Sequence, residues 1–208
     1  MTGPAIPKVF HRIWVGAAEP AQHWRWERSW RRLHPDWELV TWTDETLPPL
    51  RNQRWFDAAA SPAQRSDIAR YDLLLRYGGV YLDVDFQALR PIDELLDGVR
   101  FFCASEDEVW CSIGIMGCPA GDPVMAALVD ELGGSMRSRP DRPINEQSGP
   151  RYFTQVVNRL RSGPEPASVT VFPSSLFYPY HFSEPERAGE RFPQAYAVHH
   201  WNHSWKDQ

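Results

Sequence analysis

The run Tyr77-Gly78-Gly79-Val-Tyr-Leu-Asp83-Val-Asp85 constrains the fold of this chain more than any other stretch. The two glycines can end a helix because glycine enters the left-handed conformation without a Cβ clash. The apolar residues after them predict a short buried strand, which runs into Asp83 and Asp85. Residues two apart in an extended chain face the same way, so the two carboxylates can converge on one point.

Two converging carboxylates repel each other unless a cation lies between them or a proton bridges them. A hard divalent ion such as Mg²⁺ or Mn²⁺, which also holds a phosphate oxygen, resolves this conflict. The alternative is that Asp83 and Asp85 only cap a helix or pair with arginine. Their position at the end of a predicted strand favours the metal and phosphate interpretation.

Predicted helices and strands alternate in the first half of the chain. The best-signalled helix begins with Ser61 as N-cap, Pro62 at its first position and Gln64 as the partner in a capping box, and it ends at Gly78-Gly79. The other expected helices are 20–33, 52–60, 123–134 and one that opens at Pro150. The expected strands are 9–15, 37–42, 80–82, 100–105, 112–117, 168–172 and 195–201.

This alternation is typical of an α/β domain with a mostly parallel sheet. Ligands of such domains lie at the carboxyl ends of the strands, which is where Asp83 and Asp85 fall. A polar, proline-rich stretch, 135–149, is expected to be a loop. No boundary divides the 208 residues, so we expect one domain over 1–208.

Composition excludes several classes of protein. Hydrophobic residues make up 42% of the chain, enough for a full core, and the formal net charge of −5 argues against general nucleic-acid binding. Cys103, Cys111 and Cys118 form no Cys-x-x-Cys pair, so reduced buried thiols in a cytoplasmic protein are expected. No secretory signal or bilayer-spanning apolar run is visible.

Several motifs together resemble one known family. They are Ile6-Pro-Lys-Val-Phe-His-Arg-Ile-Trp-Val-Gly16, Ser66-Asp-Ile-Ala-Arg-Tyr71, Tyr77 through Asp85, Ser148-Gly-Pro150 and His199-His-Trp-Asn-His-Ser-Trp205. The chain resembles the glycosyltransferases with a sugar-binding region that contains the DXD motif. Relatives of that family are bacterial capsular and natural-product transferases, Golgi mannosyltransferases and, more distantly, the glucosylating domain of large clostridial toxins.

The resemblance implies a GT-A fold, a Rossmann-like α/β sandwich, and transfer of a hexose from a nucleoside-diphosphate sugar with retention of configuration. It implies that Asp85 binds Mn²⁺ or Mg²⁺ directly and that Asp83 is shared between ion and donor. His199 would complete the metal shell or donate to the diphosphate. Because imidazole is a better ligand for manganese than for magnesium, a histidine ligand favours Mn²⁺. Only one of His199 and His200 can face the site if both lie on a strand.

By the same resemblance, Asp67 and Arg70 hold the donor sugar. Their alternative role is an ion pair between residues three apart on a helix, worth a few tenths of a kcal/mol. Trp14 would stack on the base of the donor, or would be an ordinary core tryptophan. His11, on the same strand as Trp14, is expected to be a structural histidine.

The segment 196–208 is expected to close over the donor, with Ser204 and Trp205 near its phosphates. A frayed terminus is the alternative. Ser112 stands where similar proteins often carry asparagine. Serine is shorter and lacks the amide, so the identity of the donor sugar stays open.

The expected function is therefore a metal-dependent retaining glycosyltransferase. Its acceptor would be a hydroxyl of a small molecule, a glycolipid or a growing glycan, with a membrane-associated acceptor allowed. One alternative is a metal-dependent nucleotidyltransferase, although the chain lacks a glycine-rich, lysine-bearing phosphate loop. The other is a module that binds a nucleotide sugar without transferring it.

Overall fold

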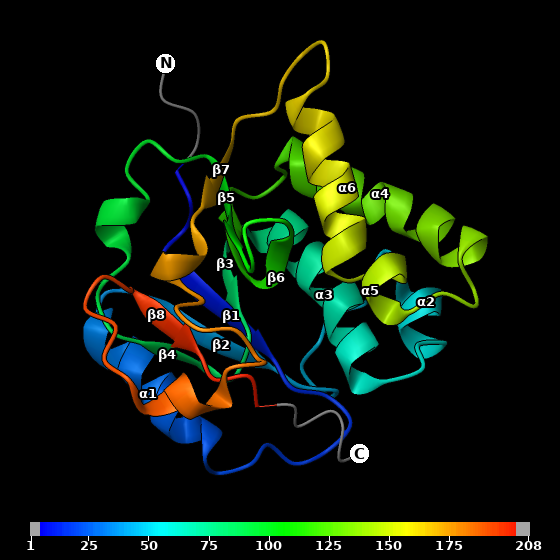
Figure 1. Cartoon of the computed structure of the whole chain (residues 1–208). Coiled ribbons are helices and arrows are strands. Elements are labelled where there is room, and N and C mark those ends of the chain that lie inside the picture. Colours follow the sequence, from blue (N-terminus) through cyan, green and yellow to red (C-terminus); the bar gives the residue numbers. More distant parts are fainter. Residues whose placement is uncertain (1–4, 203–208) are drawn as a thin grey trace.

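A six-stranded sheet forms the centre of the molecule, with strand order β2-β1-β3-β6-β5-β7 (Figure 1). The structure is a computed structural model and describes residues 5–202. The strands of this sheet are β1 (Val9–Ile13), β2 (Glu38–Trp42), β3 (Gly79–Leu82), β5 (Phe101–Ser105), β6 (Cys111–Cys118) and β7 (Val169–Phe172). Strand β6 is antiparallel to its neighbours β3 and β5, while the other pairings are parallel. The expectation of a mostly parallel α/β sheet is therefore confirmed.

Helices cover both faces of the sheet. On one side lie α2 (Gln53–Asp57), α3 (Pro62–Tyr77), α4 (Pro123–Ser138), α5 (Ile144–Gln147) and α6 (Pro150–Arg161) (Figure 1). The other side carries α1 (His23–Leu33) and a two-stranded ribbon of β4 (Phe86–Ala88) and β8 (Ala197–His199). Short 3₁₀ helices lie at Asp93–Leu95, Ser174–Leu176 and Pro185–Gly189. None of the helices within 5–202 is long and apolar enough to cross a bilayer.

The buried apolar side chains form one core on each face of the sheet. Successive strand residues alternate between the two cores because side chains of a strand point to opposite faces. In β3, Tyr81 belongs to the core under α3, α4 and α6, whereas Val80 and Leu82 belong to the core under α1. Both faces are thus sealed, and the edge at the carboxyl ends of the parallel strands is left for a site.

Helix α3 forms as its sequence predicts. The Ser61 hydroxyl accepts a hydrogen bond from the Gln64 amide at 3.2 Å. The Gln64 side chain accepts from the Ala60 amide at 2.9 Å, and not from the Ser61 amide as in the predicted capping box. Gly78 and Gly79 end the helix with φ of 64° and 93°, values that favour glycine. The helix therefore stops at a defined residue, and β3 starts at once.

Two expectations for the segment 123–149 were wrong. Helix α4 does not end at Gly133-Gly134 but continues to Ser138. Gly133 is required for packing rather than for a helix end, because a Cβ there would lie 2.9 Å from the indole nitrogen of Trp55. The stretch 135–149 is not all loop either, since α5 forms within it and Ser148 is fully buried.

The ribbon of β4 and β8 was not expected in this form. Strand β4 has only three residues, and the predicted final strand, 195–201, shortens to Ala197–His199. The ladder pairs Phe86 with His199 in antiparallel register. A three-residue strand whose partner lies at the other end of the chain leaves no periodic signal in the sequence.

Candidate metal and donor site

Asp83 and Asp85 converge because the chain turns between them. Asp83 follows β3, and its carbonyl accepts a hydrogen bond from the Phe86 amide at 3.1 Å, which closes a four-residue turn into β4. The expectation that an extended chain would align the two carboxylates was therefore wrong in its geometry. The convergence that it predicted is present, since oxygen atoms of both residues lie in one group with His199.

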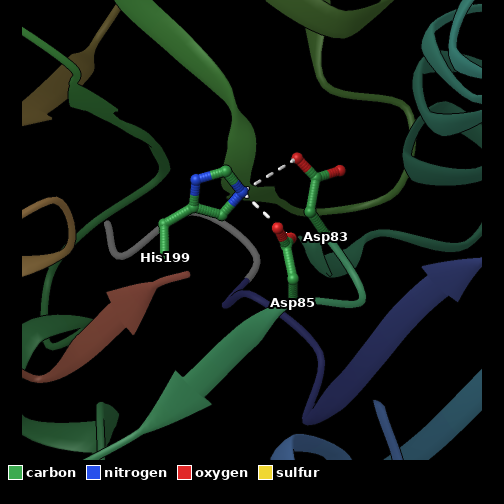
Figure 2. Close-up of side chains that lie close together, drawn as sticks. All are labelled: Asp83, Asp85 and His199. Carbon is green, nitrogen blue, oxygen red and sulfur yellow. Dashed lines mark ion pairs between the residues drawn. The ribbon is translucent and has the colours of Figure 1, made fainter. Parts of the chain in front are cut away.

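His199 faces the two aspartates from β8 (Figure 2). Its Nε2 atom lies 3.0 Å from Asp85 Oδ1 and 3.8 Å from Asp83 Oδ2. One ligand atom from each of the three residues falls within 4.8 Å of the others, which is close enough for one ion. Two carboxylate oxygens and one imidazole nitrogen suit a divalent cation, so this donor set fits the expected metal.

His200 points elsewhere. Its ring stacks on Trp26 with centroids 4.8 Å apart, and its Nε2 atom lies 2.8 Å from the Gln87 side-chain oxygen. Burial lowers the pKa of His200 to about 4, so the ring is neutral. The sequence left open which of the two histidines faces the site, and the structure assigns His199.

The pKa values of Asp83, Asp85 and His199 shift in different directions. Burial raises the pKa of Asp83, opposed by Arg70 and His199. Burial acts in the same direction on Asp85, but the charge and hydrogen bond of His199 outweigh it and hold the pKa of Asp85 below its usual range. The pKa of His199 is raised against its own burial, chiefly by Asp85. The histidine thus supplies the positive charge that an ion would otherwise bring.

Residues beyond β8 complete the surroundings of Asp85. The Asn202 amide donates to Asp85 Oδ2 at 2.8 Å, and the His200 amide donates to the Asp85 carbonyl at 3.0 Å. Trp201 lies between them with φ of 52°, a left-handed conformation that is rare for a bulky residue. Its ring packs edge-on against His199, with centroids 4.3 Å apart. Backbone strain at Trp201 thus directs an amide at the carboxylate.

Arg70 joins Asp83 to Asp67 from helix α3. Its guanidinium lies 3.3 Å from Asp83 Oδ1 and 3.1 Å from Asp67 Oδ1, and it donates to the Ile113 carbonyl at 2.8 Å. Both helix residues are buried, with 5% of Arg70 and 6% of Asp67 exposed. Burial raises the pKa of Asp67 to about 6, although Arg70 opposes it. Asp67 and Arg70 thus form the expected ion pair between residues three apart, but in a buried setting where it also orients Asp83.

All seven candidate residues within the described part of the chain line one cavity of about 310 Å³. They are Trp14, Asp67, Arg70, Asp83, Asp85, Ser112 and His199. The cavity lies at the carboxyl ends of β1 and β3, as expected for this sheet. Ser204 and Trp205 fall outside the described residues, as does the last part, 203–208, of the expected closing segment, 196–208.

Ser112 and Trp14 already have partners in the protein. The Ser112 hydroxyl accepts from the Tyr178 hydroxyl at 2.6 Å and from the Gly114 amide at 3.1 Å. The Trp14 indole donates to the Ala17 carbonyl at 2.7 Å and is half-buried, with one edge against His23. A half-buried indole at a cavity wall remains open to stacking.

His11 is structural, as expected. It is buried, its Nε2 atom lies 2.9 Å from the Gly78 carbonyl, and its Nδ1 atom accepts from the Trp42 indole. The three cysteines are free and buried.

Sequence reasoning missed four residues of the site. Tyr81 donates to Asp83 Oδ1 at 2.7 Å, and Glu106, Trp201 and Asn202 line the cavity. Glu106 directly follows β5, so the rule that placed Asp83 at a strand end would also have found it. Trp201 and Asn202 stand beside His199 in the tail motif and offered no separate signal.

Known proteins are similar to this chain over the segment that contains Asp83 and Asp85. Residues 20–102 match the family described as "Glycosyltransferase sugar-binding region containing DXD motif". The chain is 34% identical over 113 residues to "Inositol phosphoceramide mannosyltransferase 1" of Schizosaccharomyces pombe, an alignment that covers 50% of this chain and 35% of the relative. This chain therefore spans about a third of that relative's length.

Solved structures share the fold. "PaToxG Glycosyltransferase" aligns with a TM-score of 0.59 and 18% identity, over 74% of this chain and 70% of that one. A structure titled as the UDP-bound glycosyltransferase domain from the YGT toxin gives a TM-score of 0.57 and 10% identity, over 80% and 79% of the two chains. At these identities the likeness concerns the fold. The resemblance expected from the sequence is thus confirmed: residues 20–102 match the family with the DXD motif, and the chain has the GT-A fold of solved glycosyltransferase structures.

Proposed function

We propose that this protein is a metal-dependent retaining glycosyltransferase that moves a hexose from a nucleoside-diphosphate sugar to an acceptor hydroxyl. The observation that carries the proposal is the convergence of Asp83, Asp85 and His199 in one cavity at the carboxyl edge of the sheet. Trp14, the residue that follows β1, lines the same cavity, where a nucleotide base can stack on it. The three metal-site residues and Trp14 thus offer places for a metal with its diphosphate and for a base, side by side in one cavity.

Asp83, Asp85 and His199 would hold the cation, and the imidazole nitrogen favours Mn²⁺ over Mg²⁺. A bound divalent cation neutralises the charge that develops on the departing diphosphate. Arg70 fixes Asp83 and Asp67 in place through its two ion pairs, so both carboxylates are oriented before the donor arrives. The donor sugar would lie against Asp67, whose carboxylate can accept from sugar hydroxyls.

Glu106 lies on the acceptor side of this cavity. In the sheet order, β1 leads into Trp14, β3 leads into Asp83, and β6 and β5 follow. If the base lies at Trp14 and the diphosphate at Asp83, the reacting sugar carbon lies toward β6 and β5. The Glu106 side chain has no hydrogen bond or ion pair among residues 5–202, so it is available to bind the acceptor hydroxyl. We propose attack from the same face as the leaving group, with a donor phosphate oxygen taking the proton.

The names of similar proteins widen the donor and acceptor classes to test. One relative is named for mannosyl transfer to inositol phosphoceramide, and one structural neighbour was solved with UDP. Mannose carriers and UDP sugars therefore belong in the donor panel, beside carriers of glucose, galactose and N-acetylglucosamine. A lipid-linked hydroxyl belongs among the acceptors, with small molecules and glycans. A cytoplasmic location is also part of the proposal, on the basis of three free cysteines.

The test is a thermal-shift screen of these donors with Mn²⁺, followed by mass spectrometry of the released nucleotide. A donor at 100 times its dissociation constant stabilises the folded state by about 2.7 kcal/mol. We expect one class of nucleotide sugar to stabilise the protein only with metal, and that donor to be slowly hydrolysed. Stabilisation by nucleoside triphosphates alone, or by no nucleotide at all, would contradict the proposal. Binding without hydrolysis or transfer would indicate a non-catalytic module.

A further inference from the structure

The outward side of helix α1 concentrates arginine and tryptophan. Trp24, Arg25, Arg28, Arg31 and Arg32 are all exposed, and we call them the α1 basic face. At 100° per residue they fall within an arc of about 120°, so they form one continuous strip. Trp24 is 59% exposed and is one of only four large hydrophobic side chains exposed among residues 5–202. Glu27, the only acid of the helix, lies off this strip and pairs with Arg12 and Arg31.

Arg25 stacks on Trp26 and Arg31 donates to Glu27 and the Leu39 carbonyl, but contacts within the protein do not account for the other three residues of this face. The opposite side of α1 packs against the rest of the protein through its buried residues, His23, Trp26, Ser29 and Trp30. The side chains of Trp24, Arg28 and Arg32 make no hydrogen bond, ion pair or ring contact with any described residue. Four positive charges on one strip also contrast with the formal net charge of −5 for the whole chain.

We propose that the α1 basic face docks the protein on an anionic lipid bilayer. Basic side chains near a membrane surface are attracted by anionic headgroups, and tryptophan prefers the interface between water and hydrocarbon. The face is the outer surface of a helix at the edge of the molecule (Figure 1). Proteins hold single-stranded nucleic acid in a positively charged groove. The outer surface of a helix is not a groove, so the flat surface of an anionic bilayer fits the α1 basic face better.

Docking through this face would hold the candidate site close to the lipid. The buried side of α1 contacts the ribbon that carries His199: Trp30 donates to the Phe86 carbonyl at 2.8 Å, and Trp26 stacks on His200. His23, the first residue of the helix, lies 3.1 Å from the Asn202 side chain. One helix diameter, about 10–12 Å, thus separates the α1 basic face from the walls of the site.

The test is flotation of the full chain with vesicles, without donor or metal, so that it does not depend on the proposed activity. Vesicles of phosphatidylcholine alone are compared with equal mixtures of phosphatidylcholine and phosphatidylglycerol. We expect binding only to the anionic vesicles, with a loss of binding in high salt. Absence of binding to anionic vesicles at low salt would overturn the proposal.

Variants then assign the binding to the face. A basic side chain near an anionic surface contributes about fivefold to partitioning, so Arg28→Gln/Arg32→Gln should lower the partition coefficient about 25-fold. Arg28→Lys/Arg32→Lys should retain it, because the attraction depends on charge. The control Arg137→Gln/Arg161→Gln makes the same change at exposed positions of α4 and α6, on the other side of the sheet. Thermal melting checks that each variant is folded.

Two results would contradict the assignment even if wild-type protein binds vesicles. Equal losses in the α1 variant and in the control would mean that binding follows net charge and not this face. Tighter binding of a single-stranded oligonucleotide than of anionic vesicles, through the same arginines, would identify nucleic acid as the partner. Trp24→Ala adds a third readout, since loss of the interfacial ring should weaken vesicle binding several-fold.

Discussion

Gly114 leaves the space that the carboxylate of Asp83 occupies. A Cβ at position 114 would lie 2.8 Å from Asp83 Oδ2 and 2.8 Å from the Tyr178 hydroxyl. The Gly114 carbonyl also accepts a hydrogen bond from the Asp83 amide at 2.8 Å, so the two residues cannot simply separate. One glycine on β6 thus sets where the first aspartate of the motif lies.

Gly114→Ala is therefore expected to displace Asp83 and to cost about 1–3 kcal/mol of unfolding free energy, as overpacking does. Gly134→Ala is the matched control, because a Cβ there meets nothing within 4 Å and alanine favours a helix by up to about 1 kcal/mol. Urea denaturation gives both values, and Mn²⁺ titration reports the displacement. Equal stability and equal Mn²⁺ affinity in the two variants would show that position 114 can accommodate a Cβ without displacing Asp83.

His199→Gln is expected to lower the affinity for Mn²⁺ at least roughly tenfold, because it removes one of the three proposed ligands. His200→Gln makes the same chemical change one residue away and should leave metal binding unchanged, since its ring lies against Trp26. Isothermal titration calorimetry measures both variants. A loss of Mn²⁺ affinity in His200→Gln, with none in His199→Gln, would reverse the assignment of the two rings.

Asp67 should make stability depend on pH in a defined window. Its pKa is raised to about 6 in the folded protein and is near 3.9 when unfolded, so the folded state binds the proton more tightly. The stabilisation from protonated Asp67 is complete below about pH 4 and is lost as the pH rises through about 6, a change of about 3 kcal/mol. The free energy of unfolding should thus fall over this window, relative to Asp67→Asn.

Urea denaturation in EDTA at several pH values between 4 and 7 measures this difference. Asp36→Asn, at an exposed position, serves as control and should follow the wild-type curve. A constant difference between wild type and Asp67→Asn across the window would mean that the carboxyl group of Asp67 is ionised throughout.

Glu106→Gln separates donor chemistry from acceptor binding. If Glu106 orients the acceptor, transfer to acceptor should fall at least roughly tenfold, while slow hydrolysis of the donor stays within about threefold. Glu165→Gln, at an exposed position, should change neither rate. Equal loss of hydrolysis and transfer would instead indicate that Glu106 acts on the donor, for example as the nucleophile of a double displacement.

Local signals in the sequence predicted the parts of the fold that local interactions determine. Ser61 and Gly78-Gly79 bound helix α3 because capping needs only neighbouring residues. The end of α4 was missed because Trp55, remote in sequence, explains Gly133. The β4–β8 ribbon was missed for a similar reason, since each three-residue strand is stabilised by its distant partner.

In the candidate site, too, the sequence predicted what depends on neighbouring residues and missed what depends on residues far apart in the chain. Asp83 and Asp85 were predicted from their place after a buried strand, and the cavity contains both. The choice of His199 over His200 depends on the pairing of Phe86 with His199, which joins segments far apart in the sequence. The full set of Arg70 partners, on three separate segments, likewise could not be read from a helix face alone.

The most direct test of the central claim is an electron paramagnetic resonance titration of Mn²⁺ with wild-type protein and with Asp83→Asn/Asp85→Asn, each with and without a nucleoside diphosphate. We expect one wild-type site whose Mn²⁺ affinity rises when the diphosphate is present, because the aspartates and the diphosphate share the ion. In the double variant that site should disappear, while thermal melting shows a folded protein. Equally tight Mn²⁺ binding in both proteins, or a wild-type Mn²⁺ affinity that the diphosphate does not change, would contradict the assignment of Asp83 and Asp85 as metal ligands.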